Sequence, residues 1–131
     1  MTVTHSAIGD HITHPSGRRK TICTSTVLWC LDIPTDRFNY SQSVPDMIRI
    51  LNRHGYSVRS RLSTLGRGQV TVSQLRKRIA SEPPVDGAHY LIGVPAHVLL
   101  LSGDGSIVCD TAPRERDRRR VTELYIVRRK A

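Results

Sequence analysis

The segment that decides the fold spans residues 87–111 and reads GAHYLIGVPAHVLLLSGDGSIVCDT. It contains three short, mostly apolar runs, each of which predicts a strand, at residues 90–94, 97–101 and 106–110. Pro95 interrupts the chain between the first two runs. The sequence SGDG separates the last two, and its Gly and Asp residues tolerate the backbone angles of a tight turn. The segment therefore predicts three consecutive strands, the last two joined as a hairpin.

Two polar residues occupy the ends of this predicted hairpin. His97 opens one strand and Asp110 closes the next. If Leu101 pairs with Ser106, then His97 pairs with Asp110 on one face of the sheet, whereas a one-residue shift would place them on opposite faces. A histidine oriented by a carboxylate is suited to act as a general base for a nucleophile.

The rest of the chain predicts helices first and strands later. Residues 43–54 have apolar side chains at helical spacing after Ser43, a good N-cap, and residues 71–80 begin with a T-x-x-Q capping box. Residues 21–31, TICTSTVLWCL, favour a buried helix, although their β-branched side chains also permit a strand. Two further strands are predicted at residues 56–62 and 121–127. This order predicts an α+β domain with N-terminal helices packed on one face of a C-terminal antiparallel β-sheet.

Residues 1–20 are polar and predict a loosely packed N-terminal arm, followed by a single domain over residues 21–131. Three histidines of the arm invite a metal interpretation: His5, His11 and His14. No pair of cysteines accompanies them at the spacing of a zinc site, so we expect no metal.

The composition is that of a basic soluble protein. Its 20 Lys and Arg residues exceed its 11 Asp and Glu residues, for a net charge of +9, which predicts attraction to polyanions. The sequence contains neither a signal peptide nor an apolar stretch long enough to cross a membrane. The odd number of cysteines, three, indicates free thiols rather than disulfides. We therefore expect a cytoplasmic protein.

The cysteines differ in their predicted surroundings. Cys23 lies at or just before the first turn of the helix predicted at residues 21–31, where unpaired N–H groups and the helix dipole lower the pKa of a thiol. Cys30 lies two turns further along the same helix, and Cys109 points to the sheet face opposite to that of Asp110. Both are therefore expected to be buried apolar residues.

A cysteine that opens a helix, a histidine that opens a later strand and an aspartate on the next strand form a recurring arrangement. In Cys23, His97 and Asp110 the chain resembles the papain-like cysteine peptidases in their most reduced form, as in small phage and bacterial proteins. The resemblance covers residues 21–127. It implies a Cys-His-Asp triad that cleaves an amide, isopeptide or thioester bond of a protein or peptide substrate without a cofactor, in the host cytoplasm if the protein is phage-encoded.

The chain departs from the family where the oxyanion hole is concerned. Papain-like enzymes usually place a Gln or Asn shortly before the nucleophile, and residues 1–22 contain neither. The donors would instead be the backbone N–H of Cys23 together with Ser16, Thr21 or His14. His89, which also lies near a strand start, is the alternative general base, but no carboxylate follows it at hairpin distance.

A second hypothesis is a small basic protein without enzymatic activity. It would bind nucleic acid or an acidic protein through its arginine-rich segments. The residues of this predicted basic surface are Arg18, Arg19, Lys20, Arg118, Arg119 and Arg120. The low aromatic content, 5%, leaves few side chains for base stacking. A third hypothesis is a degenerate papain-like protein that acts as an inhibitor or scaffold.

Overall fold

The computed structural model describes residues 7–8, 23–33 and 43–130. The elements in chain order are β1 (Ala7–Ile8), α1 (Cys23–Cys30), α2 (Val44–Arg53), β2 (Tyr56–Ser60), the 3-10 helix η1 (Leu62–Thr64), α3 (Val72–Ala80), β3 (Ala88–Val94), β4 (His97–Ser102), β5 (Ile107–Asp110) and β6 (Glu123–Arg129). They form one sheet in the order β1-β5-β4-β3-β6-β2. Strands β2 to β6 pair with one another in antiparallel fashion, and β1 runs parallel to β5. The predicted α+β class is confirmed.

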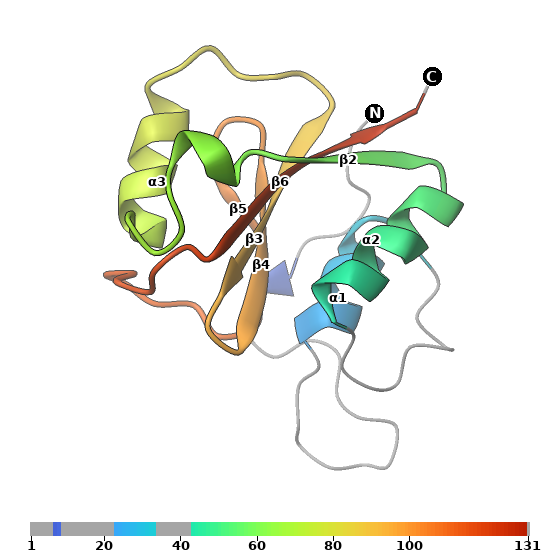
Figure 1. Cartoon of the computed structure of the whole chain (residues 1–131), viewed down its shortest axis with the longest axis horizontal. Helices are drawn as coiled ribbons and strands as arrows, with labels where there is room; N and C mark the ends of the chain where they lie inside the picture. Colours follow the sequence, from blue (N-terminus) through green and yellow to red (C-terminus); the bar gives the residue numbers. More distant parts are fainter. Residues whose placement is uncertain (1–6, 9–22, 34–42, 131) are drawn as a thin grey trace.

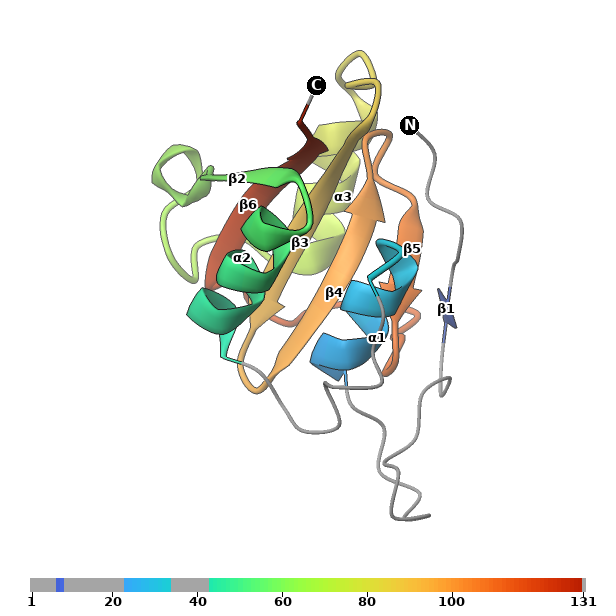
Figure 2. The ribbon, with the colours of Figure 1, turned by 90° about the vertical axis from the view of Figure 1, so that its right-hand side faces the viewer.

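The helices cover both faces of the sheet, with α1 and α2 on one side and α3 on the other (Figures 1 and 2). The expectation of helices on one face was therefore wrong for α3. The central strands explain the difference, because both sets of their alternating side chains are apolar. On β4, Leu100 packs in the core under α1 and α2, while Leu99 packs in the core under α3.

Helix α1 is confirmed as a helix rather than a strand. Its buried residues lie on nearly every side: Thr24, Ser25, Thr26, Val27, Leu28 and Cys30. A helix enclosed in this way has no polar stripe, which explains why the sequence of residues 21–31 shows no clear helical periodicity. The helix begins at Cys23 and is followed by Asp32, whose φ of 63° places it in the left-handed conformation that commonly ends helices.

The two predicted N-caps are present. The Ser43 hydroxyl accepts a hydrogen bond from the Asp46 N–H at 3.2 Å and so caps α2. At α3, the Thr71 hydroxyl accepts from the Gln74 N–H at 3.2 Å, and the Gln74 side chain accepts from the Thr71 N–H at 2.9 Å. This reciprocal pair is the capping box that the sequence predicts.

Two details of the sheet differ from the predictions. Part of the N-terminal arm joins the sheet, because Ala7 and Ile8 pair with Cys109 and Asp110 of β5. The last strand begins at Glu123 rather than Val121, since the Val121 N–H donates to the carbonyl of Val70, in the segment before α3. Within the described residues, no helix is long and apolar enough to cross a membrane.

The β4–β5 hairpin contains an irregularity that the sequence did not reveal. Leu100 pairs with Cys109 but Leu101 pairs with Ile107, so the predicted pairing of Leu101 with Ser106 was wrong. One extra residue on β5 lies between these pairs, as in a β-bulge. Continuing the register from Leu100 places Asp110 beside Leu99, which lies on the same face of β4 as His97. His97 and Asp110 are therefore diagonal neighbours on one face.

Candidate active site

Three elements bring the predicted triad together. Cys23 is the first residue of α1, His97 is the first residue of β4 and Asp110 is the last residue of β5. Cys23 and His97 line the same cavity, and the interaction of the thiol with the imidazole lowers the pKa of Cys23 and raises that of His97. The Nε2 atom of His97 lies 2.8 Å from Oδ1 of Asp110, which leaves Nδ1 as the ring nitrogen available to Cys23. The order thiol, imidazole, carboxylate is that of a nucleophile, its base and the group that orients the base.

A tight turn positions His97 at the start of its strand. Val94 pairs with His97, so Pro95 and Ala96 form the two-residue loop between β3 and β4. Proline fixes its own φ near −65°, and Ala96 has a φ of 60°, which is the pattern of a type II turn. A residue other than glycine in this conformation is unusual and tends to occur near functional sites.

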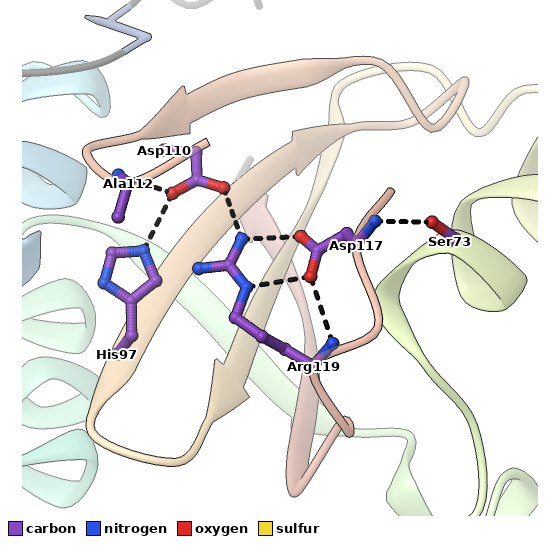
Figure 3. A network of polar contacts seen from close by, with 6 residues as sticks. All are labelled: Ser73, His97, Asp110, Ala112, Asp117 and Arg119. Atoms are coloured by element: carbon purple, nitrogen blue, oxygen red, sulfur yellow. Dashed lines mark hydrogen bonds and ion pairs between the residues drawn. The ribbon is translucent and has the colours of Figure 1, made fainter. Parts of the chain in front are cut away.

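Asp110 is fully buried and every described contact of its carboxylate is polar (Figure 3). Its Oδ1 accepts hydrogen bonds from His97 and from the backbone N–H of Ala112, at 2.8 and 2.9 Å. Its Oδ2 accepts from Nη2 of Arg119 at 2.8 Å. These contacts use both oxygens, so the carboxylate is held in one orientation against the imidazole.

Arg119 connects Asp110 to the start of α3 (Figure 3). Its guanidinium donates to Asp117 through Nε at 2.8 Å and through Nη2 at 2.5 Å. Asp117 is buried, and its backbone N–H donates to the Ser73 hydroxyl at 3.1 Å in the first turn of α3. The network therefore joins Asp110 to the first turn of α3.

The electrostatics of the site favour a thiolate and an imidazolium. Burial by itself raises the pKa of Cys23, but hydrogen bonds from the His97 side chain and from the N–H groups of Val98 and Thr24 outweigh it and lower this pKa. The hydrogen bond to Asp110, with that to Cys23, raises the pKa of His97 to about 9. A thiol pKa below its ordinary value beside an imidazole pKa above its own is the condition for an ion pair.

The carboxylate of the site remains ionised. Burial would raise the pKa of Asp110, yet the hydrogen bonds from His97, Ala112 and Arg119 together lower it. Hydrogen bonds to Asp117 and Asp110 likewise raise the pKa of Arg119, which keeps its positive charge. The imidazolium therefore faces a permanent negative charge.

A cavity of about 340 Å³ opens beside the thiol. It is lined by residues from the starts of α1 and α2, from the β3–β4 hairpin and from the start of β6: Cys23, Thr24, Val44, Gly93, Val94, Ala96, His97, Val98 and Glu123. A peptide group entering this cavity would therefore meet both the thiol and the imidazole. Sequence reasoning missed Glu123, because nothing near it in the sequence indicates that β6 starts at the site.

The other candidates of the sequence analysis lie elsewhere. Cys30 and Cys109 are fully buried in the core, as predicted, and a mutual hydrogen bond with burial raises the pKa of Cys109. His89 is buried and pairs with Ser102, at the end of β3 opposite to His97. It therefore cannot serve Cys23 as a base. The oxyanion candidates Ser16 and Thr21, with His14, and the arm histidines His5 and His11 lie outside the described residues.

The predicted basic surface needs one correction. Arg118 and Arg120 are exposed, but the Arg119 side chain is only 16% exposed and is bound by two carboxylates. Arg119 is therefore a buried partner of Asp110 rather than part of a binding surface. Arg18, Arg19 and Lys20 lie outside the described residues. The sequence did contain an indication of this ion pair, because Asp117 lies two residues before Arg119 within the charged segment.

No family model matches this chain, and no curated protein or solved structure matches it either. The site is therefore interpreted from its own geometry.

Proposed function

We propose that the protein is a papain-like cysteine peptidase or amidase that cleaves an amide, isopeptide or thioester bond through Cys23, His97 and Asp110. One observation carries the proposal: His97 lines the same cavity as Cys23, and its Nε2 atom is hydrogen-bonded to the buried carboxylate of Asp110. Structural cysteines are generally inert and buried in the core, as Cys109 is. Cys23 differs from Cys109 in having a basic partner, His97.

The proposed reaction has two steps. In the first, the Cys23 thiolate attacks the carbonyl carbon of the substrate, and the His97 imidazolium gives its proton to the leaving nitrogen or sulfur, which produces an acyl thioester. In the second, neutral His97 takes a proton from water, whose oxygen attacks the thioester and releases the acid and the thiolate. Asp110 orients the imidazole and stabilises its charged form without taking up the proton.

The start of α1 supplies the electrostatic support for this chemistry. The first four N–H groups of a helix have no partner within the helix, and Cys23 is the first residue of α1. The N–H groups of Thr24 and Val98 both lower the pKa of the Cys23 thiol. The N–H of Cys23 itself is placed to donate to an oxyanion formed on the attacked carbon, and it is the first donor we assign to an oxyanion hole.

The proposal is tested with an activated ester, p-nitrophenyl acetate, because a small acyl group requires no knowledge of the natural substrate. We expect a burst of about one nitrophenolate per protein molecule, followed by slow turnover, with the acetyl group on Cys23 by peptide mapping. The Cys23→Ala variant should lose both phases. His97→Ala should lose the burst at neutral pH, and circular dichroism should show that it remains folded.

Acetylation spread over lysines and unchanged in Cys23→Ala would overturn the proposal. The basic, non-enzymatic hypothesis would then be tested through the salt dependence of nucleic-acid binding, with Arg118→Gln and Arg120→Gln as variants.

A further inference from the structure

Glu123 brings a carboxylate into the cavity beside the predicted nucleophile. It is the first residue of β6 and pairs with Gly93 of β3. Its neighbour Leu124 packs in the core under α3, so alternation turns Glu123 toward the other face, where α1 and α2 begin. The cavity lined by Cys23 and His97 is therefore also lined by a half-buried acidic side chain.

Gly93 makes room for this carboxylate. A Cβ atom at position 93 would lie 3.1 Å from both Cβ and Oε2 of Glu123, which is closer than ordinary packing allows. Because glycine has no side chain, the Glu123 side chain lies against the backbone of β3. The Tyr125 hydroxyl donates to Oε1 of Glu123 at 3.1 Å, which holds one oxygen and leaves the other for a ligand.

No cation in the described part of the chain pairs with Glu123. The charges of the described residues do not compensate it either. Three carboxylates, of Asp110, Asp117 and Glu123, stand against two basic groups, His97 and Arg119. The described part of the site is therefore negative, whereas the net charge of the protein is +9.

We infer that Glu123 is a specificity-determining residue that binds a cationic nitrogen of the substrate, either a Lys or Arg side chain or a free α-amine, beside the bond to be cleaved. The inference rests on the proposed function, since it names the substrate class of the same site. A carboxylate held by one neutral hydroxyl and open on its other oxygen is a suitable acceptor for an ammonium or guanidinium group. The cavity volume of about 340 Å³ lies at the lower end of the range of ligand pockets, roughly 300–1,000 Å³.

The test uses three thiol reagents with the same reactive group: 2-aminoethyl, 2-hydroxyethyl and 2-sulfonatoethyl methanethiosulfonate, which are cationic, neutral and anionic. Their rates of reaction at Cys23, read by peptide mapping, are compared in the wild type, in Glu123→Gln and in Glu82→Gln. Glu82 is exposed at the end of α3, across the sheet, so its variant removes the same charge away from the cavity.

We expect Glu123→Gln to slow the cationic reagent about fivefold and to speed the anionic reagent about fivefold, as for a partly screened charge pair. The neutral reagent should react equally fast in the wild type and in Glu123→Gln, and Glu82→Gln should change none of the rates by more than about 1.5-fold. Charge preferences that are equal in Glu123→Gln and in the wild type would overturn the inference.

The neutral reagent separates this inference from the proposed function. Loss of its fast reaction in His97→Ala supports the triad whatever the behaviour of Glu123, and no loss refutes the triad alone. Protection of Cys23 then identifies the source of the cation. Protection by acetyl-lysine methylamide assigns a side-chain cation, and protection by alaninamide assigns an α-amine. Equal protection by the neutral acetyl-norleucine methylamide would contradict the role of Glu123.

Discussion

Removal of the Arg119 guanidinium tests whether this side chain holds the carboxylate of Asp110 in position and keeps it ionised. In Arg119→Met the side chain keeps an apolar stem but loses its charge, so two buried carboxylates lose their shared cation. Breaking a buried ion pair costs about 3–5 kcal/mol. Asp110 retains its hydrogen bonds from His97 and Ala112, so we expect a loss near the lower limit, about 3 kcal/mol in the free energy of unfolding.

Two further variants make the expectation specific. Arg119→Lys keeps the charge, but one ammonium cannot reproduce the hydrogen bonds to both Asp110 and Asp117, so we expect a loss of about 1.5–3 kcal/mol. Arg118→Met removes an equal charge from an exposed neighbour and should change stability by less than about 0.5 kcal/mol. The assay is urea unfolding at pH 7, with the slopes compared to confirm a common two-state transition.

Loss of the Arg119 guanidinium should also shift the pH dependence of Cys23 alkylation in a defined direction. Arg119 helps to lower the pKa of Asp110, so Arg119→Met should raise that pKa. Asp110 would then be protonated at higher pH and would release His97, which shifts the acidic limb of Cys23 alkylation to higher pH. Arg118→Met should leave that limb unchanged. An Arg119→Met protein with wild-type stability and an unshifted limb would refute the account of Arg119 as the residue that positions Asp110.

Four further predictions concern the cap of α3, a close backbone contact and the imidazole of His97. Thr71→Ala removes the capping box of α3 and should cost about 1 kcal/mol in urea unfolding; no measurable loss would contradict the cap. Gly103→Ala places a Cβ 2.4 Å from the Val85 carbonyl oxygen and should lower the melting temperature, whereas an unchanged melting curve would refute this close approach. The imidazole of His97 should titrate near pH 9 by NMR and nearer pH 6.5 in Asp110→Asn. Because its folded pKa is raised, the stability from His97 is present below about pH 6.5 and is lost as pH rises through about 9, which unfolding at both pH values can check.

The sequence predicted those parts of the fold that depend on local signals. Ser43 and Thr71 cap their helices through contacts three residues away, and such contacts are visible in the sequence. The α+β class followed from the order of the elements. The placement of α3 on the second face could not be predicted from the sequence. When both faces of a strand are apolar, the pattern does not indicate which helix covers which face.

The juxtaposition of His97 and Asp110 was predicted through a register that the structure does not have. The bulge near Leu101 changes the pairing, yet the two side chains still meet as diagonal neighbours. The bulge depends on one extra residue of β5, and hydrophobic alternation over four residues is too short to reveal it. The prediction of the shared face held because side chains two residues apart on a strand lie on the same side.

Residues that join the site through tertiary contacts were beyond sequence reasoning. Arg119 was assigned to a basic surface because it stands in an arginine-rich segment, but folding places its guanidinium between Asp110 and Asp117. Glu123 reaches the cavity only because β6 pairs with β3 and because Gly93 leaves space for it. The contact of Arg119 with Asp110, nine residues away, and the pairing of Glu123 with Gly93 on another strand have no local pattern in the sequence.

The central claim is that His97 holds Cys23 as a thiolate, and the most direct measurement is the pH dependence of Cys23 alkylation by iodoacetamide, followed by peptide mapping. The wild type and His97→Ala are compared. Cys30 and Cys109 need no substitution, since both are fully buried. The account predicts fast wild-type alkylation below pH 8.5, the value for an ordinary thiol, and a midpoint raised to about 8.5 or above in His97→Ala, where only the N–H groups of Val98 and Thr24 still oppose the effect of burial. A wild-type midpoint at or above about 8.5 that is unchanged in His97→Ala would contradict it.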